Sequence, residues 1–122
     1  MNAMLGNTVP KNKYGAKAAR CAHGHNHPSR KEAKRCGELH LLQRAGVISD
    51  LANQPEFWFS INGRQVKHPN GRRVGYKADF SYRENGAHVV EDTKSKATKT
   101  EAYALRTAIF RALFPDIVFR ET

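Results

Sequence analysis

The stretch VGYKADFSYRENGAHVVEDTK, residues 74–94, decides the fold because it predicts two strands joined by a tight turn. Asn85-Gly86, near its middle, is typical of the type I′ turn of a two-residue hairpin. The return strand is expected at His88–Lys94. The first strand is expected at Val74–Arg83, where every second residue is apolar or aromatic and would face the same way: Val74, Tyr76, Ala78, Phe80 and Tyr82.

The turn also fixes which residues of the hairpin face each other. Counting outward from it places Asp79 directly opposite Asp92. Because side chains alternate along a strand, Asp79, Asp92 and Lys94 share one face. Glu91 points to the other face, where the sheet margin or an ion pair with a helix residue would accommodate it. A bulge near Asn85 would exchange the roles of Glu91 and Asp92.

This shared face carries the residue types of a metal site. Two carboxylates opposed across a strand pair repel each other. A Mg²⁺ ion between Asp79 and Asp92, with Mn²⁺ as a substitute, would remove the repulsion, because Mg²⁺ prefers oxygen ligands and keeps waters for chemistry. Lys94 is placed to stabilise charge on a phosphate or to help deprotonate an attacking water. A solvated outer face of mixed charges is the structural alternative.

Before the hairpin, the sequence predicts a helix and then an aromatic strand. The helix is expected to begin at Ser29, which forms a capping-box pattern with Glu32, and to end near Gly46. Val47 and Ile48 are expected to lead into a loop. The aromatic run Glu56–Ile61 favours a strand. Two further turns are expected, at Asn62-Gly63 and Asn70-Gly71.

After the hairpin, a second helix is expected over Thr98–Leu113, ended by Pro115. A short strand should follow at Asp116–Arg120 and pair in parallel with the strand before the helix. The order helix, three strands, helix, strand predicts an α/β fold with a mixed sheet. The apolar stripe of the second helix is expected to consist of Leu105, Ala108, Ile109 and Ala112.

The charge of the 122-residue chain favours a nucleic-acid partner. It has 21 Lys+Arg and 11 Asp+Glu, a formal net charge of +10. Residues 1–20 are expected to be a flexible basic arm and residues 21–122 one domain. Neither a signal peptide nor a membrane-spanning run is present, so a cytoplasmic protein is expected. The residues expected to contact DNA phosphates are Lys11, Lys13, Lys17, Arg20, Arg30, Lys31, Lys96 and Lys99.

Tyr76–Phe80 followed by Val89–Lys94 resembles the PD-(D/E)XK pattern of restriction-endonuclease-like nucleases. The resemblance implies that Asp79 and Asp92 hold the metal and that Lys94 completes the catalytic site. Ala78 stands where the pattern has its proline, which has no chemical role. The wider layout of residues 11–120 is similar to a family of small phage and prophage proteins in this superfamily, which implies a phage protein in a bacterial cytoplasm.

Glu32 has two interpretations. The superfamily often adds an acid from its first helix, and Glu32 is the candidate for that metal ligand. It also shares a helix face with Cys36 and Leu39, where a carboxylate needs a partner. Alternatively, Glu32 only completes the cap of the helix with Ser29. The sequence leaves both roles open.

A second cluster raises the question of structural zinc. It consists of Cys21, His23, His25, His27 and Cys36, whose spacing matches no standard zinc finger. A short hairpin turning at His23-Gly24, with exposed histidines, is the simpler interpretation. The two cysteines are expected to be thiols rather than a disulfide in a cytosolic protein.

Together these observations predict a Mg²⁺-dependent DNA endonuclease with Glu32, Asp79, Asp92 and Lys94 as its catalytic residues. A chain this short has no separate sequence-reading domain, so branched or otherwise structured DNA is the expected substrate. A homodimer would cut two strands, in a Holliday-junction-resolvase-like role in phage recombination or replication. The alternatives are a non-catalytic nucleic-acid-binding protein, possibly stabilised by zinc, and an interaction protein that kept the fold without the activity.

Overall fold

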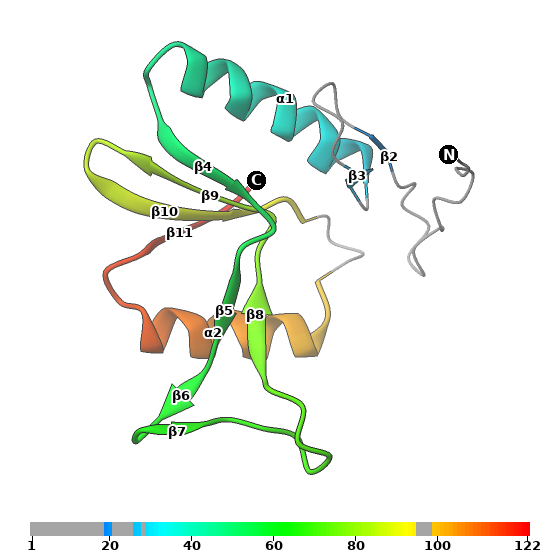
Figure 1. The fold of residues 1–122 in the computed structure, drawn as a ribbon. Helices are drawn as coiled ribbons and strands as arrows, with labels where there is room; N and C mark the ends of the chain where they lie inside the picture. Colours follow the sequence, from blue (N-terminus) through cyan, green and yellow to red (C-terminus); the bar gives the residue numbers. More distant parts are fainter. Residues whose placement is uncertain (1–18, 21–25, 28, 95–98) are drawn as a thin grey trace.

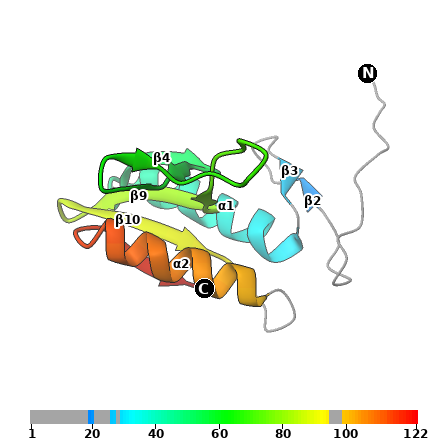
Figure 2. The ribbon, with the colours of Figure 1, turned by 90° about the horizontal axis from the view of Figure 1, so that it is seen from below.

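The structure is a computed structural model that describes residues 19–20, 26–27, 29–94 and 99–122 (Figure 1). Within these residues, a mixed four-stranded sheet in the order β11-β10-β9-β4 lies between two helices, one on each face (Figure 2). The fold is therefore of the mixed α/β class, as predicted. The elements of this core are α1 (Arg30–Arg44), β4 (Ser49–Asn53), β9 (Phe80–Glu84), β10 (Ala87–Asp92), α2 (Glu101–Leu113) and β11 (Val118–Glu121).

The central hairpin has the predicted turn and register. Asn85 and Gly86 have φ values of 52° and 80°, as a type I′ turn requires. Cα pairing runs from Ala87 with Glu84 to Glu91 with Phe80. Asp79 directly precedes Phe80, and Asp92 directly follows Glu91. The two aspartates therefore lie together just beyond the last pair.

The first strand of this hairpin is not continuous, which corrects the prediction for Val74–Arg83. It is divided into β8 (Gly75–Lys77) and β9, and β8 leaves the sheet to pair with β5 (Glu56–Trp58). The side chains expected on one face therefore separate. Tyr76 and Ala78 pack in the core under α2, whereas Phe80 and Tyr82 pack in the core under α1.

The strand that pairs with β8 and β9 is interrupted at the same position along the sheet, between β4 and β5. Gln54 has a φ of 52°, and Pro55 follows it between β4 and β5. The two breaks are joined by hydrogen bonds, from Ala78 N–H to the Pro55 carbonyl (3.0 Å) and from Gln54 N–H to the Asp79 carbonyl (2.8 Å). The long strand pair thus bends as a unit (Figure 1), and Asp79 lies between β8 and β9 at the bend.

Strand β4 is the element that the sequence did not predict. Val47 and Ile48 were expected to lead into a loop, but β4 follows them directly and Ile48 is buried in the core under α1. The aromatic run forms β5 and β6 (Ser60–Ile61), and Asn62-Gly63 turns into β7 (Arg64–Gln65). Asn70-Gly71 also turns the chain, because His68 N–H donates to the Arg72 carbonyl across it.

Helix α1 begins and ends as predicted. The Ser29 hydroxyl accepts the Glu32 N–H (3.1 Å), and Gly46 has a φ of 81° after the last turn. Cys36 and Leu39 pack from the helix against Ile48, Phe80, Tyr82 and Val89 of the sheet.

Helix α2 begins at Glu101, with Thr100 as its N-cap, and its buried stripe differs from the predicted one. Leu105 is 61% exposed, and Ala108 and Ala112 are exposed as well. The aromatic residues decide the orientation because they bury more apolar area than alanines do. Ile109 packs against the core as predicted, together with Tyr103, Thr107, Phe110, Leu113 and Phe114.

The remaining elements are short. Strand β11 pairs in parallel with β10, as predicted, with Val118 opposite Val89. Strands β2 (Ala19–Arg20) and β3 (Asn26–His27) pair antiparallel at the N-terminal side. No helix in the described part of the chain is long and apolar enough to cross a membrane.

Candidate active site

Three acidic side chains meet at the end of the sheet where the long hairpin bends. Asp79 comes from the bend before β9, Asp92 from the last residue of β10 and Glu32 from the first turn of α1. All three are buried, with exposed fractions of 7%, 0% and 2%. The structure therefore brings the sequence-predicted acids together, and it does so within the protein rather than on a solvated face.

Asp79 is held by the residue that follows Asp92. The Thr93 backbone N–H and the Thr93 hydroxyl both donate to Asp79 Oδ2, at 2.7 and 2.9 Å. Two hydrogen bonds to one oxygen fix the rotation of the carboxylate. The end of β10 thus sets the orientation of the acid across the hairpin.

Asp92 is held on one oxygen only. The Tyr76 hydroxyl of β8 donates to Asp92 Oδ2. Asp92 Oδ1 lies 3.4 Å from Lys94 Nζ, but it is buried and has no hydrogen bond in the described part of the chain. Buried polar atoms in native proteins are nearly always hydrogen-bonded, so the ion pair with Lys94 leaves this oxygen incompletely satisfied.

The raised pKa values of the cluster also indicate that its negative charge is not fully compensated. Burial and the adjacent charge of Asp79 raise the pKa of Glu32 to about 8. Burial and a hydrogen bond with Asp79 likewise raise the pKa of Asp92 to about 8, against the opposing effect of Lys94. At neutral pH, the cluster therefore retains protons unless a cation replaces them.

Lys94 is positioned by strand and helix together. Its backbone N–H donates to the Thr122 carbonyl (3.2 Å), which extends the pairing of β10 and β11 past their ends. Its carbonyl accepts from Lys31 Nζ of α1 (3.2 Å), and its own Nζ lies 5.3 Å from the centre of the Tyr103 ring. The ammonium group is therefore held at the opening of the site.

Glu91 lies on the opposite face, as the register predicts. Its carboxylate accepts from Arg35 of α1 at 2.5 and 3.0 Å and from the Tyr82 hydroxyl at 2.6 Å. This is the expected ion pair with a helix residue, although Glu91 is fully buried rather than at the margin of the sheet. Glu91 is thus a structural link between β10 and α1.

The donor set of the cluster fits Mg²⁺ better than a transition metal, because it contains carboxylates and neither histidine nor thiolate. In the described residues, no three or more His, Cys, Asp or Glu side chains converge into a ready cage for an ion. Mg²⁺ does not need such a cage, since it binds through one or two carboxylates plus waters and phosphate oxygens. Asp92 Oδ1, which accepts no hydrogen bond in the described residues, is consistent with that mode of binding.

The predicted DNA contacts are only partly visible. Arg30 and Lys31 are exposed at the start of α1, beside the acids. Lys99 is exposed but pairs with Glu121 at 3.0 Å. Arg20 lies on β2, and its side chain is outside the described residues, as are all of Lys11, Lys13, Lys17 and Lys96.

The predicted zinc cluster falls largely outside the described residues, which exclude Cys21, His23, His25 and the side chain of His27. Cys36 is described and buried, and its thiol lies 3.7 Å from Asn53 Oδ1. The pairing of Ala19 with His27 and of Arg20 with Asn26 agrees with a hairpin between them.

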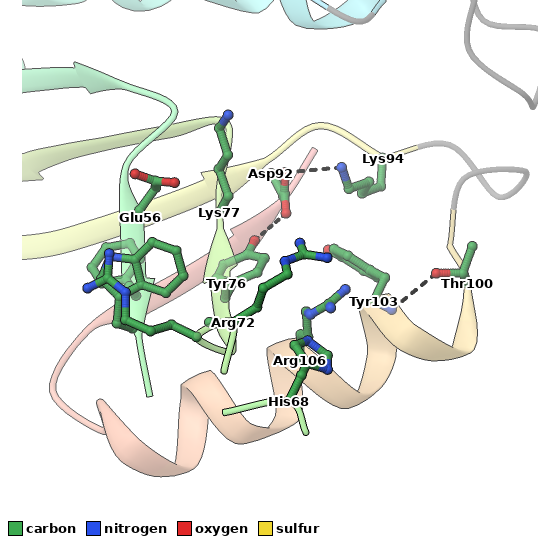
Figure 3. A pocket seen from close by; sticks show the side chains of 14 residues that line it. Glu56, His68, Arg72, Tyr76, Lys77, Asp92, Lys94, Thr100, Tyr103 and Arg106 are labelled. Carbon is green, nitrogen blue, oxygen red and sulfur yellow. Dashed lines mark hydrogen bonds and ion pairs between the residues drawn. The ribbon is translucent and has the colours of Figure 1, made fainter. Parts of the chain in front are cut away.

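Sequence reasoning missed the residues that support the acids. Tyr76 and Thr93 hold Asp92 and Asp79, and Gln54 bonds to the Glu32 side chain. The alternation around Tyr76 identified it only as a core residue. Also missed was a pocket beside Asp92 and Lys94, formed by β5, β8 and α2 (Figure 3).

Residues 11–121 match a family of proteins of unknown function, DUF1064, and the chain belongs to that family. No curated protein and no solved structure matched the chain.

Proposed function

We propose that this member of the DUF1064 family is a Mg²⁺-dependent endonuclease that hydrolyses phosphodiester bonds of DNA. The observation that carries the proposal is the buried cluster of Glu32, Asp79 and Asp92 with Lys94 at its opening. The net charge of +10 supports a polyanionic substrate. The layout of α1, hairpin, α2 and parallel β11 is also compatible with a restriction-endonuclease-like core.

Burying carboxylates against one another is unfavourable without a cation. Desolvation and mutual repulsion both favour the protonated forms, which explains the raised pKa values of Glu32 and Asp92. A fold gains no stability from this arrangement, in contrast to a fully paired acid such as Glu91. We infer that Asp79 and Asp92, together with Glu32, hold the ion.

In the proposed mechanism, Mg²⁺ supplies positive charge against the phosphate oxygens and increases the acidity of water when it is bound. Thr93 and Tyr76 keep Asp79 and Asp92 in fixed orientations, so the site does not reorganise during the reaction. Lys94 holds a proton at Nζ, 3.4 Å from Asp92 Oδ1, and stabilises negative charge on the phosphate.

The biological role is proposed from the net charge of +10 and from the resemblance to small phage nucleases. Structured or branched DNA is the preferred substrate, and a homodimer would place two sites on two strands. A Holliday-junction-resolvase-like activity in phage recombination or replication would fit such a protein. Arg30 and Lys31 of the first turn of α1 would contact phosphates, as would the basic residues of the N-terminal arm.

The test is cleavage by variants that leave the fold intact. Asp92→Ala and Lys94→Ala should each abolish cleavage in Mg²⁺ or Mn²⁺ while DNA binding is largely retained. Asp116→Ala and Lys67→Ala are matched controls, because both side chains are exposed and neither touches the acid cluster. Linear, flapped, forked and four-way DNA should be compared, with cleavage followed on denaturing gels.

Two results would redirect the proposal. Undiminished nicking by Asp92→Ala would show that the acids are not the catalytic site. If the wild-type protein binds these DNAs but cleaves none of them with either metal, the non-catalytic nucleic-acid-binding alternative is favoured. Metal analysis of protein purified without a histidine tag tests whether zinc contributes to that alternative.

A further inference from the structure

The pocket beside Asp92 and Lys94 has a volume of about 460 Å³ (Figure 3). Its walls come from strands β5 and β8, from the turn around Arg72 and from the first turns of α2. Small-molecule sites typically have volumes of roughly 300–1,000 Å³. The pocket therefore has room for one nucleotide, but not for a base pair stacked within a duplex.

The floor of the pocket is basic. Arg72, from the segment before β8, and Arg106, from α2, project toward the same space near Tyr76 and Tyr103 (Figure 3). In the described part of the chain, no carboxylate forms an ion pair with either guanidinium, whereas Arg35 and Arg120 are both paired with glutamates. Unpaired guanidinium groups that converge in a pocket suit a phosphate, which accepts two parallel hydrogen bonds from each.

One wall of the pocket is flat and aromatic. Trp58 is 39% exposed, and the Arg73 guanidinium lies 4.0 Å from the centre of its ring. Gly75 lets the indole pack onto β8, because a Cβ there would lie 2.8 Å from Trp58 Cε3 and would also collide with the Phe57 carbonyl oxygen. The indole and the guanidinium together give a fixed surface on which a nucleobase can stack.

We propose that this pocket binds one unpaired nucleotide of the strand that is cut, next to the scissile phosphate. The base stacks at Trp58 and Arg73, and the phosphate on its far side contacts Arg72 and Arg106. Asp92 and Lys94 line the same pocket, so a nucleotide there places its neighbouring phosphate at the acids. The inference rests on the proposed nuclease function and narrows its substrate to DNA with an unpaired nucleotide, such as a flap or branch point.

The binding step can be measured without cleavage because Trp58 is the chain's single tryptophan. Tetrathymidylate added to protein in a metal chelator should quench the tryptophan fluorescence in a saturable way. The double variant Arg72→Ala/Arg106→Ala should bind at least about tenfold more weakly, since it loses two charged phosphate contacts. Arg44→Ala/Arg83→Ala is the matched control, because it removes the same charge from residues outside the pocket.

A second variant tests the stacking wall. Trp58→Ala should weaken the binding of fluorescein-labelled tetrathymidylate about tenfold, within the range found when an aromatic base platform is removed. Ile61→Ala, an exposed apolar residue on the neighbouring β6, should bind normally. The single variants Arg72→Ala and Arg106→Ala should each give part of the loss seen in the double variant.

Several outcomes would overturn the inference. A fully paired DNA hairpin that quenches as strongly as tetrathymidylate would show that no unpaired nucleotide is needed. Thymidine monophosphate that binds as tightly as the oligonucleotide would indicate a site for a free nucleotide instead. Normal binding by Arg72→Ala/Arg106→Ala would show that the pocket is not the site.

Cleavage distinguishes this inference from the proposed function. If the wild-type protein binds tetrathymidylate in the pocket but cuts no DNA, the nuclease proposal fails and the pocket stands. If it cuts flapped and fully paired DNA equally well, and the double arginine variant does the same, the nuclease proposal stands and the pocket inference is wrong.

Discussion

Glu91 and Asp92 are adjacent on β10 and both are fully buried, yet they meet different surroundings on the two faces of the sheet. On the α1 face, Glu91 receives hydrogen bonds from Arg35, Tyr82 and Thr122, so both of its oxygens are satisfied. On the other face, Asp92 keeps one buried oxygen without a hydrogen bond in the described residues, and Asp79 adds a second negative charge nearby.

We infer that this difference separates a structural acid, Glu91, from an acid that takes part in the proposed function, Asp92. Burial alone does not distinguish them, because a carboxylate paired with arginine and tyrosine is stable in the interior. What distinguishes Asp92 is the incomplete compensation of its charge and its place beside an open pocket. The following predictions test this contrast, from the largest expected effect to the smallest.

Removing the charge of Glu91 should destabilise the fold most. Glu91→Gln leaves Arg35 with only the exposed Glu38 as a counter-charge, and breaking a buried ion pair in this way costs about 3 kcal/mol of unfolding free energy. Asp92→Asn should cause a smaller loss, because it gives up the ion pair with Lys94 but also relieves the repulsion from Asp79. Urea unfolding of both variants measures the difference in unfolding free energy. An equal loss of stability in the two variants would contradict the proposed contrast between Glu91 and Asp92.

The stability of the metal-free protein should fall as the pH rises. Glu32 and Asp92 have folded-state pKa values of about 8, above their ordinary values. The folded state therefore binds more protons than the unfolded state, and stability present below about pH 4 is lost as the pH rises toward 8. We expect most of this loss between pH 5 and pH 8.

Thermal melts in a chelator at several pH values provide the measurement. Mg²⁺ should restore more stability at pH 8 than at pH 5, because it takes the place of the protons on the acids. Asp92→Asn should flatten the pH dependence. A melting temperature that rises from pH 5 to pH 8 in the chelator would have the wrong sign for this account.

Removing the hydroxyl of Tyr76 should reduce cleavage about tenfold, the lower end for a residue that orients a metal ligand. Tyr76→Phe keeps the ring packed against Phe110 but deletes the hydrogen bond to Asp92 Oδ2. The Glu91 face offers the matched variant Tyr82→Phe, which deletes the hydrogen bond to Glu91 and should leave cleavage nearly unchanged. Equal losses of activity would contradict the assignment of the two faces.

The smallest expected effect comes from a variant of α1, which contributes a residue to the acid cluster and a residue to the Glu91 ion pair. Ser29→Ala removes the N-cap of α1, the helix that carries both Glu32 and Arg35, and should cost about 1 kcal/mol of stability. Its effect on cleavage should follow the stability loss alone. Circular dichroism melts and initial cleavage rates at a temperature where the variant is fully folded check this prediction.

The predictions from sequence were accurate where local chemistry decides the outcome. Asn85-Gly86 permits one hairpin register, and that register placed Asp79 near Asp92 and sent Glu91 to the opposite face. Ser29 and Gly46 marked the ends of α1 in the same way. Each of these residues acts through its own backbone conformation or a hydrogen bond within a few residues.

The predictions failed where distant segments compete. The alternation of Val74–Arg83 does not reveal the bend at Asp79, which depends on Gln54 and Pro55 in the partner strand. Strand β4 has little apolar character of its own and forms because β9 pairs with it. The orientation of α2 depends on the aromatic cluster around Phe110, and the pocket depends on segments brought together by that bend.

The most direct test of the central claim is calorimetric titration of untagged protein with Mn²⁺, which replaces Mg²⁺ at oxygen-ligand sites. We predict that the wild-type protein binds Mn²⁺ at the acid cluster, that Asp92→Asn abolishes this binding and that Glu91→Gln retains it when folded. Undiminished Mn²⁺ binding by Asp92→Asn, or an absence of binding by the wild-type protein, would contradict the assignment of Glu32, Asp79 and Asp92 as a divalent-cation site.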